Sequence, residues 1–186
     1  MEDFKSIKLI AKNLFISYCD YKYFSSSNGD ILKAAFLDQN QNLFKRIRYY
    51  LYFFTIVELN KLFYSNESYS ISKFLNREIK DNNNSPKARE LKKLLQRVKT
   101  KSIQSTLSKV YNLRKKYLAH LDPDRLDYTD IKINVQEIDN ILEIVKDFLI
   151  ILNPVYEGSE YTYPYSETDL GYNLHKPYFK LKNLGH

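Results

Sequence analysis

The longest helical pattern of this chain ends in Leu113-Arg114-Lys115-Lys116-Tyr117-Leu118-Ala119-His120-Leu121-Asp122. From residue 87 into this segment, apolar side chains recur every three or four positions, as they do on one face of a helix. They are Leu91, Leu94, Leu95, Val98, Leu107, Val110, Tyr111, Tyr117 and Leu118. Pro123 disfavours helical geometry at the residue before it, so a helix over 87–118 must end by Asp122. The segment therefore predicts a long helix with an arginine and a histidine near its end.

The same helical period recurs in most of the chain. It predicts helices over 2–24, over 30–64 with a polar break at 38–42, over 71–79 after a Ser68-Tyr69-Ser70 cap, and over 135–152, where Asn153-Pro154 ends the last one. Only four glycines and five prolines occur, too few for an all-β sandwich or a doubly wound fold. We expect an all-α, antiparallel bundle of four to five helices over 1–154. An irregular, tyrosine-rich C-terminal arm should follow over 155–186.

Several function classes are disfavoured by what the sequence lacks. It has no glycine-rich phosphate loop, and its single cysteine, Cys19, allows neither an internal disulfide nor a cysteine zinc site. The three histidines, His120, His175 and His186, show no metal-ligand spacing. The most apolar run covers only residues 49–57, and residues 1–15 lack the apolar core of a signal peptide. We expect a cytoplasmic protein with no membrane span, no metal and no cofactor.

The charge of the chain is segregated. The formal net charge is +7. Residues 85–120 hold eleven Lys and Arg against one acid, whereas residues 121–170 hold twelve acids against three bases. A basic helix can track an RNA backbone, and the residues expected to do so are Lys92, Lys93, Arg97, Lys99 and Lys101. A solvated helix face is the alternative interpretation.

Arg114 falls on the apolar face of its helix, whereas Lys115 turns away from it. A buried arginine is costly unless it pairs with a carboxylate or an anion, and Glu58, which is also expected to face the core, is one such partner. An arginine can hold a phosphate by forked hydrogen bonds, and His120 can move protons near neutral pH. The alternatives are a structural ion pair or a snorkelling side chain for Arg114, and a helix cap for His120.

Residues 114–122 resemble the Arg-x4–6-His signature of HEPN domains, small helical proteins that are often metal-independent ribonucleases. The surroundings resemble the AbiU-like abortive-infection branch, with a central helix ending like residues 57–64, a short helix like 71–75 and a last helix like 133–153. The resemblance covers residues 43–153. It places the family's arginine on Arg114, its histidine on His120 and its trailing aspartate on Asp122. Within the same segment, Tyr117 is predicted to support the site. Lys115 departs from the family pattern, which usually has asparagine there.

The resemblance implies a metal-independent endoribonuclease of the toxin–antitoxin or phage-defence type. It also implies a homodimer whose two motifs meet, and an antitoxin partner. Attack by a ribose 2′-hydroxyl would leave a 2′,3′-cyclic phosphate. Two alternatives stay open: a non-catalytic HEPN module that binds RNA or a protein, and a helical interaction protein with no nucleic-acid role.

Overall fold

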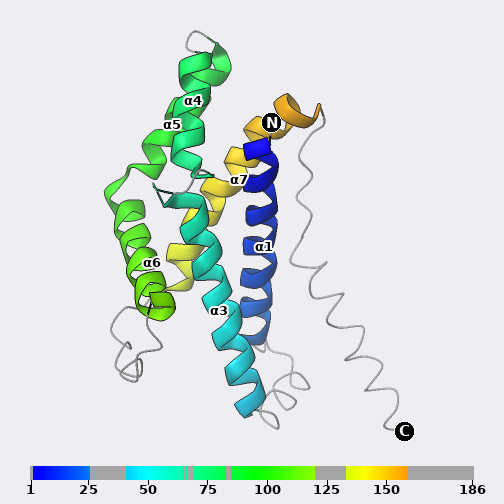
Figure 1. The fold of residues 1–186 in the computed structure, drawn as a ribbon, viewed down its shortest axis with the longest axis vertical. Helices are drawn as coiled ribbons and strands as arrows, with labels where there is room; N and C mark the ends of the chain where they lie inside the picture. The colour runs from blue at the N-terminus through cyan, green and yellow to red at the C-terminus, as the bar shows by residue number, and fades with distance from the viewer. Residues whose placement is uncertain are drawn as a thin grey trace, which may run out of the picture. The chain divides into compact units, whose positions relative to one another are not determined.

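The computed structural model describes residues 2–25, 41–64, 66, 69–82, 85–119 and 133–158, with the backbone alone at 41 and 116–119. Every regular element in these ranges is an α-helix (Figure 1). In chain order the helices are α1 (Glu2–Ser25), α3 (Gln41–Phe63), α4 (Ile71–Asp81), α5 (Pro86–Val98), α6 (Lys101–Ala119) and α7 (Val135–Glu157). The predicted all-α class is confirmed, although the described ranges hold six helices, one more than the upper limit of the prediction.

The additional helix arises because the expected helix over 87–118 is interrupted at Lys99 and Thr100. The Thr100 N–H donates to the Arg97 carbonyl at 3.1 Å, and the Thr100 hydroxyl donates to the same oxygen at 2.8 Å. This tight turn ends α5, and the bond from the Gln104 N–H to the Thr100 carbonyl at 2.9 Å begins α6. A threonine hydroxyl competes for backbone carbonyls in this way. The prediction of one continuous helix was therefore wrong.

The last helix also differs from its prediction, because α7 continues through Pro154 to Glu157 and ends at Gly158, whose φ is 69°. Contacts beyond the proline explain the extension. Tyr156 stacks on Phe4 with ring centroids 4.8 Å apart and donates a hydrogen bond to the Glu78 carboxylate. These tertiary contacts outweigh the loss of one backbone hydrogen bond at the proline. Residues 155–157 are thus helical rather than part of an irregular arm, and 159–186 lie outside the described residues.

The chain divides into two compact units, 1–11 with 56–162 and 12–55 with 163–186. In the first unit, α4 packs on α5, and α7 packs on both α5 and α6 (Figure 1). The core of this unit includes buried apolar side chains from α5 and α7, namely Leu91, Leu94, Val98, Ile141, Val145 and Leu149. At one end of the unit, Phe4, Phe74 and Phe148 form an aromatic cluster with Tyr156.

In the second unit, α1 and α3 share polar and aromatic contacts. The Thr55 hydroxyl lies 3.3 Å from the Ser17 hydroxyl and donates to the Leu51 carbonyl at 2.9 Å. Two aromatic pairs accompany them: Tyr21 with Tyr52, and Phe24 with Phe44, each with centroids 5.4 Å apart. Along one face of α1, apolar residues at helical spacing are each at most 2% exposed: Phe4, Ile7, Ala11, Leu14 and Tyr18.

The apolar residues of α3 do not all lie on its buried side. Leu43 and Phe54 are each 56% exposed, whereas Ile56, Leu59 and Leu62 are buried. A helix that is apolar on several faces has no single stripe from which the buried side can be read. The expected cap of α4 also differs in detail. Ser70 occupies the cap position, but its hydroxyl is buried and makes no hydrogen bond within the described residues.

We expect Glu137→Gln to weaken folding at pH 7 and to matter less as the pH falls. Glu137 completes a capping box with Asn134 at the start of α7. A hydrogen bond from Lys109, followed by one from the Asn134 backbone, lowers the pKa of Glu137. A carboxyl whose folded-state pKa is depressed stabilises the fold above its unfolded pKa, and this stabilisation is lost as the pH falls through the folded value.

Urea midpoints of the wild type and of Glu137→Gln, measured from pH 7 down through the acidic range, test this. Glu143→Gln is the matched control, because that carboxylate is exposed and lies 3.8 Å from Lys146 on the same helix. The control should change little at any pH. A loss of stability in Glu137→Gln that stays constant down to the acid end would contradict an ion pair between Glu137 and Lys109.

Candidate functional site

Arg114 lies in the last part of α6 and is half-buried, at the edge of a buried face that includes Val110 and Leu113. No carboxylate of the described residues forms an ion pair with it. The neighbouring Lys115 is exposed, as predicted. A partly buried guanidinium without a carboxylate partner favours an anion as its ligand.

Tyr64, just after α3, and Tyr111, on α6, stack beside Arg114. Their ring centroids are 5.1 Å apart and their planes differ by 13°. The Asn66 amide nitrogen donates to the Tyr64 hydroxyl at 3.2 Å. Hydrogen bonding with Tyr111 raises the pKa of Tyr64, while the positive charge of Arg114 acts in the opposite direction. The guanidinium is therefore close enough to influence Tyr64 electrostatically.

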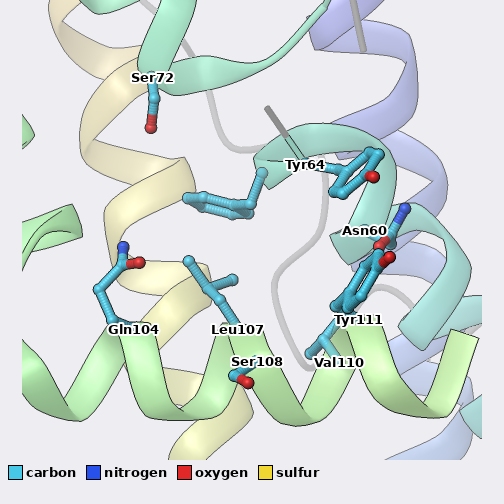
Figure 2. Close-up of a pocket in the computed structure, with 9 residues that line it drawn as sticks. Asn60, Tyr64, Ser72, Gln104, Leu107, Ser108, Val110 and Tyr111 are labelled. Atoms are coloured by element: carbon cyan, nitrogen blue, oxygen red, sulfur yellow. The ribbon is translucent and has the colours of Figure 1, made fainter. Parts of the chain in front are cut away.

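The tyrosine pair forms one side of a pocket of about 340 Å³ bordered by α3, α4 and α6 (Figure 2). Four polar residues line it: Asn60, Ser72, Gln104 and Ser108. The rest of the lining is aromatic or aliphatic: Phe63, Tyr64, Leu107, Val110 and Tyr111. Arg114 is seven residues from Leu107 and four from Val110, so it lies along the pocket side of α6, one helical turn further on. A pocket of mixed polarity thus lies next to a guanidinium that pairs with no carboxylate among the described residues.

Glu58 is 6% exposed, which confirms that it faces the core. One of its carboxylate oxygens accepts a hydrogen bond from Lys61 at 2.7 Å, and the other has no hydrogen-bond partner within the described residues. At about 100° per residue, Glu58 lies on the opposite face of α3 from the pocket residues Asn60 and Tyr64. Its carboxylate is therefore placed to hold Lys61 rather than to line this pocket.

The sequence matches the family model HEPN_AbiU2, described as AbiU2, over residues 8–173. The chain belongs to the AbiU2 family of HEPN proteins. This confirms the resemblance drawn from residues 43–153, and the match extends well beyond them. No curated protein and no solved structure matches the chain significantly.

The structure describes only part of the motif of this AbiU2 protein. Arg114 and Lys115 are described fully, and Tyr117 by its backbone in α6. His120 and Asp122 lie outside the described residues. The roles of all five residues at the motif therefore stay predictions.

The proposed RNA-tracking residues lie on and between α5 and α6. Lys92, Lys93, Lys99 and Lys101 are exposed. Arg97 is exposed as well, but it forms an ion pair with Asp147 of α7. That pair joins two helices, which gives Arg97 a structural role as well as a surface charge.

Neither a metal site nor a membrane span is present in the residues that the structure describes. No cluster of three or more His, Cys, Asp or Glu side chains suited to a metal occurs there. Within the same ranges no helix is both long enough and apolar enough to cross a membrane.

Sequence reasoning missed the pocket next to Arg114 as a site. Its polar members stand on three helices, and nothing local connects Asn60 or Ser72 to the motif. One signal was available: Tyr111 precedes Arg114 by three residues and therefore shares its side of the helix. A second was the polar Asn60 four residues before an aromatic, Tyr64, at the end of the central helix.

Proposed function

We propose that this AbiU2-family protein is a metal-independent endoribonuclease that acts in the cytoplasm in toxin–antitoxin or phage-defence biology. The observation that carries the proposal is Arg114, half-buried on α6 and unpaired by any described carboxylate, at the position of the family's motif arginine. A guanidinium held in this way can bind a phosphate with two parallel hydrogen bonds. In RNA, each linking phosphate lies next to a ribose 2′-hydroxyl that can act as the nucleophile.

In the proposed reaction the ribose 2′-hydroxyl attacks the adjacent phosphorus. The new bond closes a 2′,3′-cyclic phosphate, and the bond to the 5′-oxygen breaks. One His120 takes the 2′-hydroxyl proton and another donates a proton to the leaving 5′-oxygen. Arg114 stabilises the charge that builds on the phosphate in the transition state.

A homodimer can supply both the general base and the general acid, because a two-fold axis brings the same residues of two copies into one cleft. Each copy contributes one His120 and one Arg114. Asp122 and Tyr117 are supporting residues in this proposal, and an antitoxin is an expected partner. The assignments of Arg114, His120 and Asp122 follow the family motif residue by residue.

The test is cleavage of bulk RNA and tRNA in EDTA by the wild type and by His120→Ala. We expect cleavage by the wild type alone, with cyclic-phosphate and 5′-hydroxyl ends, and no cleavage of DNA, which lacks the 2′-hydroxyl. Intact RNA with folded, dimeric wild type would reject the ribonuclease. Equal cleavage by both proteins would remove His120 from the mechanism.

A second candidate function is a non-catalytic HEPN module that binds RNA or a protein partner. The observation that favours it is the exposed Lys115, a cation at the position where the family usually has asparagine. RNA binding that weakens steeply with salt, survives the loss of His120 and is never followed by cleavage would support this alternative.

A further inference from the structure

The pocket beside Arg114 has the size and walls of a site for one flat ring. Its volume of about 340 Å³ lies at the lower end of the roughly 300–1,000 Å³ typical of small-ligand sites. Aromatic side chains form part of its wall, including the stacked Tyr64 and Tyr111. Nucleobases bind proteins largely by stacking on such rings. These features suit a single base better than a folded segment of protein.

Asn60 supplies the pocket with an unused amide. The residue is 3% exposed, and its side chain makes no hydrogen bond with any described residue. An amide of this kind offers a ligand in the pocket both a donor N–H and an acceptor C=O. Adenine offers such a pair, because its N6 amino group donates and its N7 accepts.

Gln104 adds a fixed acceptor. Its amide nitrogen donates to the Val98 carbonyl at 2.7 Å, across the break between α5 and α6. That bond fixes the orientation of the amide and leaves the oxygen available as an acceptor on the pocket side (Figure 2). An acceptor matches the exocyclic amino group of adenine and opposes the O4 oxygen of uracil.

We propose that this pocket binds an adenine base of the RNA, next to the phosphate held by Arg114. The proposal rests on the proposed function in that RNA is taken as the ligand. Tyr111 and Arg114 are three residues apart on one helix, a rise of about 4.5 Å along its axis. A single nucleotide can therefore place its base against Tyr111 while its phosphate reaches Arg114. The pocket would set the sequence preference of the protein.

The test measures affinity by fluorescence anisotropy with 2′-O-methyl oligouridine of roughly ten nucleotides, with or without one central adenosine. Such RNA lacks the nucleophilic hydroxyl, so wild-type protein can be used without cleavage. We expect the adenosine to tighten binding by about tenfold, the discrimination of one good amide–adenine pair. Ser108→Tyr, which fills the pocket from an exposed position, should abolish that preference.

Ser105→Tyr is the matched control, because Ser105 is exposed on the same helix and does not line the pocket. It should keep the adenosine preference. Equal affinity for the two oligonucleotides, no binding of either, or a preference that survives Ser108→Tyr would overturn the base pocket. An adenosine preference lost in Ser108→Tyr, from a wild type that never cleaves RNA, would support the pocket and reject the ribonuclease. Cleavage of RNA without any adenosine preference would support the ribonuclease and reject the base pocket.

Discussion

Arg114→Lys should lower the rate of RNA cleavage by roughly a hundredfold or more, the usual loss when one preorganised donor to a developing charge is removed. Lysine keeps the charge but offers a single ammonium in place of the planar fork, so it cannot make two parallel bonds to a phosphate. Arg114 is half-buried, so water cannot readily replace the missing donors. The measurement is the single-turnover rate at saturating protein, which separates chemistry from binding.

Arg89→Lys is the matched control for this prediction. Arg89 is exposed on α5, also in the basic half of the chain. An exposed contact with a phosphate is mostly a point-charge interaction, which lysine retains, so the control should cleave at nearly the wild-type rate. The RNA affinity of Arg114→Lys should change far less than its rate. A rate close to wild type in Arg114→Lys would exclude this guanidinium from transition-state stabilisation.

The part of the site that could be predicted from sequence is the part encoded locally. The spacing of Arg114 from Leu107 and Val110 placed it beside the buried face of a helix, and the burial of Glu58 followed from similar reasoning. The pocket could not be predicted, because it forms where the C-terminal end of α3 and the start of α4 lie next to α6. Periodicity identifies which face of a helix is buried, but not which other helix covers it.

The errors in the fold have the same origin. Thr100 interrupts a helical period that is otherwise continuous, and its signal is only a hydroxyl able to compete for a carbonyl. Pro154 has the opposite effect: it is a strong local signal to stop, yet it is overridden by the contacts of Tyr156 with Phe4 and Glu78. Local rules fail where tertiary contacts contribute more free energy than local preference does.

Phe148→Ala should destabilise the protein by about 3–5 kcal/mol, the usual cost of truncating a buried phenylalanine. Phe148 is fully buried, with its ring centroid 6.2 Å from that of Phe4 and 5.6 Å from that of Phe74. These rings join segments of α1, α4 and α7 that lie far apart in the sequence. Backbone hydrogen bonds cannot replace such contacts, because in a helix they join residues of that same helix and not different helices.

Urea unfolding followed by circular dichroism gives the free-energy change from the shift in midpoint at constant slope. Ile150→Ala is the control on the same helix, since that side chain is 46% exposed and should cost less than about 0.5 kcal/mol. A loss in Phe148→Ala no larger than in the control would mean that the aromatic cluster does not hold these segments together. A large, selective loss would show that the unit that carries Arg114 and its pocket depends on the aromatic packing of α7 against Phe4 and Phe74.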